Sequence, residues 1–364
     1  MSSLVVGVTG DLISPDGSYL FPDYSLEPLI SDERVAMDRI PCVPDLPPEV
    51  LTRVDILVSV PMGMAIKRQS LRCATRTVAI VRVGVGYEDV DVDAMTEAGV
   101  ALVVPSSATR RPTAVAAFTL ILALATRLLD KHRLTLAGPD QWSRRPELRG
   151  TDLEGLTLGL IGCGHIGQDL IGLVKPLGLR VLVSDPAVST EQAYLIGAEP
   201  VSLEDLLSRS DFVSLHCPLN SKTRHMIDER RLALMKSSAY LVNTARGGLV
   251  DQAALAAALC ANRIAGAGLD VLEPEPPGPD DPILKCGNVV FSAHALNWTK
   301  GLDAALGRAN VESIHSILRG EVPNGLVNPA VTDNPLFQDK MSHLGASMQD
   351  PHHRTLVKQD WIVS

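Results

Sequence analysis

Short apolar runs rich in β-branched residues alternate with helical patterns along most of the chain. This alternation is typical of β-α-β units and predicts an α/β fold with parallel sheets. Four runs precede residue 110 and six follow residue 155, which indicates two sheets and therefore two domains. The runs are Leu4–Val8, Ile56–Val60, Val78–Arg82, Ala101–Val104, Leu158–Ile161, Arg180–Ser184, Phe212–Leu215, Ala239–Val242, Gly266–Leu269 and Asn288–Phe291.

The segments between and after these runs suggest how the domains are connected. A helix is predicted from Pro112 to about Leu129, followed by a polar surface arm over residues 130–155. Helical patterning returns at 303–318, after the last predicted strand, so we expect the chain to return to its first domain there. The predicted boundaries are 1–107 and 300–331 for a discontinuous domain, 108–299 for the inserted domain and 332–364 for an extended or partly ordered tail.

Composition excludes several classes of protein. With 46% hydrophobic and 21% charged residues, the 364-residue chain has ordinary globular usage. Its formal net charge of −9 gives no basic surface for nucleic acid or an anionic membrane. The longest apolar stretch, 114–125, is too short to span a bilayer. The N-terminus lacks the pattern of a signal peptide, and the six cysteines are widely spaced without a CxxC pair, so we expect a cytoplasmic protein without a metal site.

A glycine-rich loop follows the first strand of the second domain. In GLIGCGHIG, Gly162, Gly164 and Gly167 have the G-x-G-x-x-G spacing, directly after a strand and before a helix. This context is typical of a dinucleotide pyrophosphate site, where His165 and Ile166 would lie along the ligand. The pattern alone is also compatible with a glycine-rich turn that binds nothing.

Asp185 ends the next predicted strand, 23 residues after Gly162. A carboxylate at about this distance can bind the adenosine ribose hydroxyls and would repel a 2′-phosphate, so the sequence favours NAD over NADP. The competing interpretation of Asp185 is a turn cap before Pro186.

Further polar candidates follow the carboxyl ends of predicted strands in the second domain, which is the edge where parallel sheets bind ligands. Arg246 lies in a glycine-bearing turn, where it could bind a carboxylate or could be an ordinary surface arginine. The candidates are Cys217, Pro218, Thr244, Ala245, Arg246, Asp270, Glu275 and His294.

Together, GCGHIG, Asp185, HCPLNSKTRHMI, LVNTARGGLVDQAAL, GLDVLEPEP and His294 resemble the D-isomer-specific 2-hydroxyacid dehydrogenase family over roughly residues 78–329. The resemblance implies a Rossmann NAD-binding domain inserted in a discontinuous flavodoxin-like substrate domain, with the active site between them. It implies that Arg246, Glu275 and His294 are catalytic. It also implies substrate binding by Val83, Gly84, Val85, Gly86, Arg246 and His294, and NAD binding by Gly162, Gly164, His165, Ile166, Gly167, Asp185, Cys217, Pro218, Thr223, Thr244, Ala245, Arg246, Asp270 and His294.

The chemistry of the reaction agrees with these residue types. Reduction of a ketone by hydride produces an alkoxide, which a protonated histidine such as His294 can neutralise near neutral pH. A carboxylate such as Glu275 favours the charged imidazole. The guanidinium of Arg246 can bind the carboxylate of a 2-oxo acid and polarise its carbonyl.

Two alternative functions remain open from sequence. One is an NAD-responsive, corepressor-like binding protein without turnover. The other is oxidation of formate or phosphite, although formate oxidation is expected to have an amide where this chain has Glu275. Ala295–Trp298 departs from the small residues that the family often has after the histidine, so the sequence predicts the substrate only as a small 2-hydroxy or 2-oxo acid. The apolar helix after Pro112 and the polar arm predict a homodimer.

Overall fold

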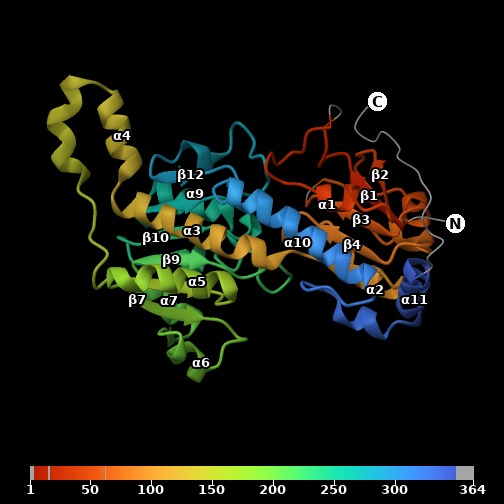
Figure 1. Ribbon diagram of the computed structural model, residues 1–364. Helices are drawn as coiled ribbons and strands as arrows, with labels where there is room; N and C mark the ends of the chain where they lie inside the picture. The colour runs from red at the N-terminus through yellow and green to blue at the C-terminus, as the bar shows by residue number, and fades with distance from the viewer. Residues whose placement is uncertain (1–3, 15–16, 62, 350–364) are drawn as a thin grey trace. The chain divides into compact units, whose positions relative to one another are not determined.

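The computed structural model describes residues 4–14, 17–61 and 63–349. It divides into two compact units, one formed by the described residues of 1–109 and 298–364, the other by 110–297. Each unit contains one parallel sheet with helices on both faces (Figure 1). The predicted fold class, α/β with a Rossmann domain, is confirmed by the strand orders described below.

The sheet of the discontinuous unit has the strand order β2-β1-β3-β4-β5, which is the flavodoxin-like order. Its strands are β1 (Leu4–Thr9), β2 (Val35–Ile40), β3 (Ile56–Ser59), β4 (Ala79–Arg82) and β5 (Ala101–Val103). Its helices are α1 (Glu27–Ile30), α2 (Val92–Glu97), α10 (Lys300–Leu318) and α11 (Pro335–Gln349), with 3-10 turns Pro48–Thr52, Ser70–Cys73 and Pro329–Asp333.

Successive residues of these strands enter opposite apolar cores. On β3, Ile56 and Val58 pack against α10, whereas Leu57 packs with the 3-10 turns and α2 on the other face. This period of two arises because adjacent side chains on a strand point to opposite sides of the sheet. Both faces are covered, so the strands other than the edge strand β2 are mostly apolar runs without polar alternation.

The sheet of the inserted unit has the order β12-β11-β10-β9-β6-β7-β8, a Rossmann arrangement in which the chain starts at the centre and builds outward in both directions. Its strands are β6 (Thr157–Ile161), β7 (Arg180–Ser184), β8 (Glu199–Pro200), β9 (Phe212–Leu215), β10 (Tyr240–Asn243), β11 (Gly266–Leu269) and β12 (Val289–Phe291). Its helices include α5 (His165–Val174), α6 (Thr190–Leu195), α7 (Leu203–Arg209), α8 (Glu229–Leu232) and α9 (Gln252–Cys260), with 3-10 turns Lys175–Leu177, Gly247–Leu249 and Pro282–Lys285.

Helix α3 (Ser106–Ala125) begins six residues before the predicted start and contains Pro112 in its interior. A proline removes only one backbone donor, and the rest of the helix is retained here. The helix ends before Arg127, whose φ of +52° separates it from α4 (Leu128–Leu136). Along α3, Ala117, Leu120 and Ile121 are buried in the apolar core of the Rossmann unit.

The predicted polar arm consists of α4 and the 3-10 segment Pro139–Leu148, neither of which has a buried residue. In Figure 1, α4 projects away from the sheet of its own unit. The arm therefore exposes apolar side chains, with Leu136 74% and Trp142 50% accessible.

The expectation of an extended or partly ordered tail is wrong for residues 335–349, which form α11; residues 350–364 lie outside the described part of the chain. Phe337 and Leu344 lie on one face of α11 and are buried in the core of the discontinuous unit. Lys340 Nζ donates to the carbonyl oxygens of Thr77, Ala98 and Gly99 at 3.1, 2.8 and 3.1 Å. These contacts anchor the helix.

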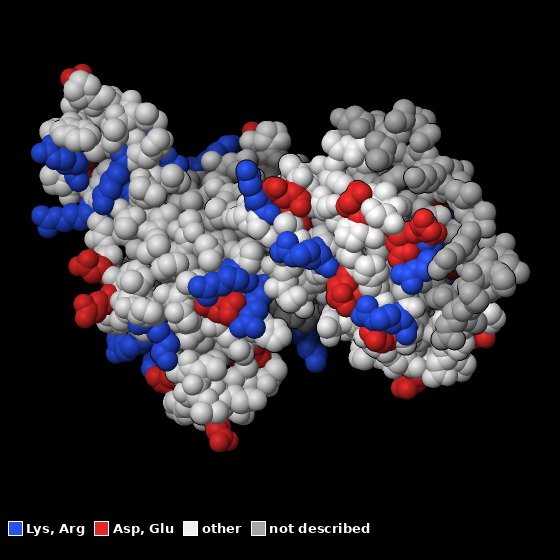
Figure 2. All heavy atoms as spheres, viewed as in Figure 1, with Lys and Arg blue, Asp and Glu red and all other residues white. Residues whose placement is uncertain are grey.

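Within the described residues, no individual helix has the length and hydropathy needed to cross a membrane. The pair α3 and α4 meets that test only when the two are taken together, across a bend of 59°. On the face seen in Figure 2, Lys and Arg side chains are interspersed with Asp and Glu, consistent with the net charge of −9.

Candidate active site

The glycine loop connects β6 to α5, and its three glycines have different surroundings. Gly162 has φ +90°, and a Cβ there would lie 2.7 Å from the backbone of His216 and Cys217. A Cβ on Gly167 would lie 2.9 Å from Gly162 O, so this glycine allows α5 to approach the loop. A Cβ on Gly164 would meet nothing within 4 Å. Packing therefore explains Gly162 and Gly167, whereas open space beside Gly164 leaves room for a ligand at the N-terminus of α5.

Asp185 follows β7 and lies beside this loop. Its Oδ2 accepts a hydrogen bond from Cys163 N at 2.6 Å, and its Oδ1 accepts one from Ala187 N at 2.8 Å. The ionised carboxylate has about four acceptor positions, so both oxygens can still accept from ribose hydroxyls. Asp185 thus also acts as the turn cap that was the competing interpretation from sequence.

Thr244 directly follows β10. Its side-chain oxygen is buried and has no hydrogen-bond partner among the described residues. A buried hydroxyl without a partner costs free energy unless a ligand completes it. The open space at Gly164, the amides of α5, the Asp185 carboxylate and this hydroxyl together fit a nicotinamide dinucleotide.

The turn that carries Arg246 is held by Asn243, the last residue of β10. Asn243 Nδ2 donates to Arg246 O at 2.8 Å, and Asn243 Oδ1 accepts from Ala245 N at 3.0 Å. Arg246 Nη1 donates to Ala245 O at 2.6 Å. Asn243 is not among the residues predicted from sequence, although an asparagine at the end of a strand is a recognisable turn signal.

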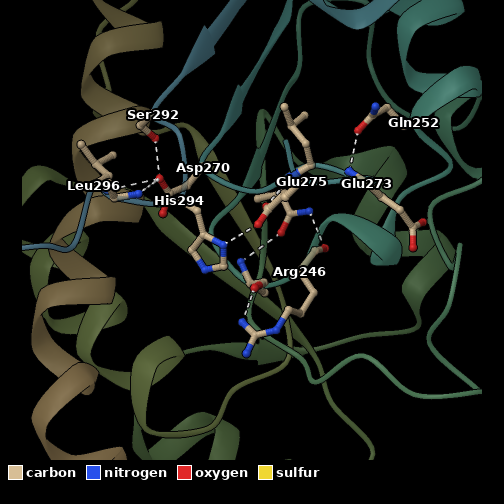
Figure 3. A network of polar contacts seen from close by, with 12 residues as sticks. Arg246, Gln252, Asp270, Glu273, Glu275, Ser292, His294 and Leu296 are labelled. Atoms are coloured by element: carbon tan, nitrogen blue, oxygen red, sulfur yellow. Dashed lines mark hydrogen bonds and ion pairs between the residues drawn. The ribbon is translucent and has the colours of Figure 1, made fainter. Parts of the chain in front are cut away.

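The side chains of His294 and Glu275 are in hydrogen-bond contact beside Arg246 (Figure 3). His294 Nδ1 lies 2.7 Å from Glu275 Oε2, while Glu275 Oε1 accepts from Leu272 N at 2.8 Å. Burial alone would raise the pKa of Glu275, but the hydrogen bonds from His294 and Leu272 and the charges of His294 and Arg246 outweigh it and lower this pKa. The carboxylate is therefore ionised and able to stabilise a protonated imidazole.

The backbone at His294 is in an uncommon conformation for a residue with a side chain. His294 and Ala293 have φ of +55° and +52°, and His294 N donates to Asp270 O at 2.6 Å. The Asp270 side chain holds the same loop, since its Oδ1 accepts from Ser292 Oγ, Ala295 N and Leu296 N at 2.8, 3.1 and 3.2 Å. The loop fixes the direction of the imidazole, and such strained residues cluster at functional sites.

A second network supports the segment that contains Glu275. Gln252, at the start of α9, accepts from Glu273 N at 2.9 Å and donates to Asp281 at 2.7 Å. The Glu273 carboxylate accepts from Arg224 at 2.8 Å and lies 3.0 Å from His225 Nε2. Gln252 and Glu273 are not among the residues predicted from sequence, because their roles depend on contacts between distant loops.

The remaining predicted cofactor residues show mixed surroundings. Burial raises the pKa of Cys217 to about 11, so its thiol is neutral. The Thr223 hydroxyl donates to Pro218 O at 2.7 Å and accepts from Asn220 N at 2.8 Å, so it is engaged within its own loop. His165 is exposed at the start of α5. Ile166 packs against one apolar core of the Rossmann unit and Ala245 against the other.

The predicted substrate loop Val83–Gly86 follows β4 in the discontinuous unit, and Gly84 adopts φ +122°. The fully buried guanidinium of Arg82 holds this loop. Arg82 Nη2 pairs with Asp89 at 2.7 and 2.9 Å, Nη1 donates to Ser59 Oγ at 3.1 Å, and Nε donates to Gly86 O at 3.3 Å. These bonds hold the glycine-rich turn in its conformation.

A Rossmann sheet with this glycine loop, an acidic residue after its second strand and a histidine-carboxylate pair at the sheet edge defines the class of nicotinamide-dependent dehydrogenases. Comparison with known proteins gives the family. Residues 118–295 match the model of the D-isomer specific 2-hydroxyacid dehydrogenase NAD binding domain.

The relatives agree over most of the chain. Glyoxylate reductase of Korarchaeum cryptofilum is 39% identical over 76% of this chain and 83% of the relative. D-3-phosphoglycerate dehydrogenase of Methanocaldococcus jannaschii is 38% identical over 82% of this chain and 57% of the relative. The solved D-lactate dehydrogenase of Aquifex aeolicus, complexed with NAD and lactic acid, has a TM-score of 0.76 at 26% identity, covering 89% of this chain and 99% of that one.

This chain belongs to the D-isomer-specific 2-hydroxyacid dehydrogenase family. The family resemblance drawn from sequence is confirmed, as are the enzyme class, an NAD-dependent 2-hydroxyacid dehydrogenase, and NAD as cofactor.

Proposed function

We propose that this chain interconverts a small D-2-hydroxy acid and its 2-oxo acid, with His294 as the acid/base, Glu275 as its partner and Arg246 as the group that binds substrate. The observation that carries the proposal is the 2.7 Å contact between His294 Nδ1 and Glu275 Oε2 at the carboxyl edge of the Rossmann sheet. A histidine in this position can donate a proton to the oxygen on the carbon that is reduced, and can accept that proton in the reverse reaction.

The contact with Glu275 determines which ring nitrogen of His294 exchanges a proton with the substrate. NAD supplies or accepts the hydride when bound. Because Glu275 engages Nδ1 of His294, the proton that His294 transfers is the one on Nε2. In reduction Nε2 donates to the developing alkoxide, and in oxidation the neutral ring accepts the hydroxyl proton. Glu275 remains ionised throughout and stabilises the charged ring.

The charged guanidinium of Arg246 lies close enough to Glu275 to lower the pKa of that carboxyl, after burial and hydrogen bonding. We propose that Arg246 also binds the substrate carboxylate and polarises its carbonyl. The backbone amides of Val83, Gly84, Val85 and Gly86 are proposed as further donors to the substrate carboxylate. Glycine-rich turns suit this role because their amides are accessible.

For the cofactor, we propose that the amides at Gly164, His165 and Ile166 bind the pyrophosphate and that Asp185 binds the adenosine ribose. Thr244 and Asp270, at the ends of β10 and β11, are proposed to lie at the nicotinamide end. Gly162 and Gly167 contribute through the shape of the loop. Cys217, Pro218, Thr223 and Ala245 remain proposed cofactor contacts.

The names of the relatives suggest which substrates to test first. A panel of glyoxylate, hydroxypyruvate, 3-phosphohydroxypyruvate and pyruvate, each with NADH, is followed by the loss of NADH absorbance. We expect turnover with at least one 2-oxo acid and reversal with NAD and the corresponding 2-hydroxy acid, in its D form where that acid is chiral. Absence of turnover with every acid, despite measurable NADH binding, would contradict the proposed activity and favour the binding-protein alternative.

We also propose that the enzyme is a cytoplasmic homodimer. The arm formed by α4 and Pro139–Leu148 has no buried residue and exposes Leu128, Leu136 and Trp142 at 56%, 74% and 50%. A second copy of the chain could cover these side chains. Light scattering should give twice the chain mass at micromolar concentration, and Leu136→Lys should shift the protein toward the monomer. A fully active wild-type monomer would contradict this proposal.

A further inference from the structure

Two cysteines of the Rossmann unit are in direct contact, although they are 26 residues apart in the sequence. Cys260 is the last residue of α9, and Cys286 follows the 3-10 turn Pro282–Lys285 just before β12. Their Sγ atoms lie 3.0 Å apart. An approach of about 1 Å would bring them to the length of a disulfide bond.

The two thiols differ in accessibility. Cys260 is exposed, whereas Cys286 is buried and its Sγ lies 3.7 Å from Ala256 O and 3.6 Å from Pro282 O. Burial and the neighbouring Cys260 thiol raise the pKa of Cys286 to about 12. An accessible thiol that is oxidised first, beside a protected thiol that reacts second, is the arrangement of a peroxidatic and a resolving cysteine.

We propose that Cys260 and Cys286 form a reversible disulfide when the enzyme is exposed to hydrogen peroxide. The Cys260 thiolate attacks one peroxide oxygen, the O–O bond breaks, and the departing hydroxide takes up a proton to become water. This leaves Cys260 as a sulfenic acid. The Cys286 sulfur then attacks the Cys260 sulfur, the S–O bond breaks, and the hydroxyl leaves as a second water with the proton from Cys286. Two thiols lose two electrons and two protons, and one peroxide becomes two waters.

The bond would join parts of the unit that also carry the active site. The loop that it closes contains β11 together with Asp270 and Glu275. Closing a loop of this length restricts the unfolded chain and so stabilises the folded one. The proposal does not depend on the catalytic assignments, because its readouts are covalent linkage and thermal stability.

The linkage can be mapped directly in the full chain. Reduced, desalted protein is treated with hydrogen peroxide, blocked with iodoacetamide, unfolded and digested with trypsin. Arg263 and Lys285 lie between the two cysteines, so the disulfide would join the separate peptides 247–263 and 286–300. We expect this linked pair in the mass spectrum, its loss after dithiothreitol, and the disappearance of two of the six thiols.

Matched variants test the pairing. Oxidation should raise the Tm of the wild type by roughly 5–10 °C. It should leave the Tm of Cys260→Ser and Cys286→Ser unchanged. Cys73→Ser, which removes an exposed cysteine of the other unit, should still form the linkage. If Cys286→Ser does not fold, Cys260→Ser alone tests the pairing, because Cys260 is exposed. Sulfinic acid on Cys260 without linkage, or linkage of Cys260 to another cysteine, in the oxidised wild type would overturn the proposal. An equal rise in the Tm of Cys260→Ser on oxidation would also overturn it.

Discussion

Glu275→Gln isolates the charge in the pair with His294. Glutamine has nearly the same shape as glutamate, and its amide oxygen can still accept the hydrogen bond now made at 2.7 Å to Nδ1. The negative charge is lost, and with it the electrostatic preference for the protonated ring. Reduction of a 2-oxo acid needs that ring to carry its proton, so reduction should fail at a lower pH in the variant.

The size of the effect follows from the exposure of the pair. A hydrogen bond to a charged group contributes about 1.5–3 kcal/mol. The His294 side chain is 37% exposed and that of Glu275 is 21% exposed, so solvent screening favours the lower end of the range. About 1.5 kcal/mol corresponds to roughly one pH unit. We therefore expect the alkaline midpoint of the reduction profile to move down by about one unit.

The assay is the pH dependence of kcat for reduction at saturating NADH and 2-oxo acid. Glu273→Gln is the matched control, because Glu273 lies two residues away and pairs with Arg224 and His225, not with His294. Its profile should keep the wild-type midpoint. Superimposable profiles for wild type and Glu275→Gln would contradict this prediction, since the carboxylate would then have no influence on the group that titrates.

Two further predictions concern the cofactor and α11. Asp185→Ala should weaken NADH binding by tenfold or more, because about 1.5–3 kcal/mol is lost with each hydrogen bond to the charged carboxylate, and it should reduce discrimination against NADPH. Steady-state kinetics with both cofactors would measure the two effects. An unchanged ratio of kcat/KM for NADPH to that for NADH would contradict the ribose assignment. Burial lowers the pKa of Lys340 from its usual 10.5 to about 8. Between these two pH values the unfolded chain holds more protons than the folded chain, so the free energy of unfolding should rise with pH. Lys340→Met should remove that rise, and it should lower the free energy of unfolding by roughly 1–3 kcal/mol because three carbonyl groups lose their donor. Urea titrations of both proteins from pH 8 to 10 measure these effects. Identical free energies of unfolding for the two proteins over this range would contradict the prediction.

Much of the fold could be predicted because buried parallel strands are apolar on both faces. The two missed strands lack this property. On β2, five of its six residues are only partly buried and the run contains Asp38 and Arg39. Strand β8 is a two-residue edge strand that ends in Pro200. Helix α11 was missed although Phe337 and Leu344 have helical spacing, because most of the intervening residues are polar.

The candidate site shows a similar division. The glycine spacing, Asp185 and the residues at strand ends could be found from sequence, since each follows a recognisable local pattern. The partners that fix them could not, because they come from distant loops. Ser292 and Gln252 acquire their roles through hydrogen bonds to Asp270 and to the backbone of Glu273. The contact between Cys260 and Cys286 likewise depends on where α9 ends relative to β12.

His294 is the residue that we propose transfers the proton during reduction. The most direct measurement compares wild type with His294→Ala in two ways, by kcat for NADH-dependent reduction of the best 2-oxo acid and by the Kd for NADH. We expect kcat to fall by about 100-fold or more while the Kd for NADH changes little, since proton transfer is lost but the glycine loop and Asp185 remain. Wild-type turnover in folded His294→Ala would contradict it.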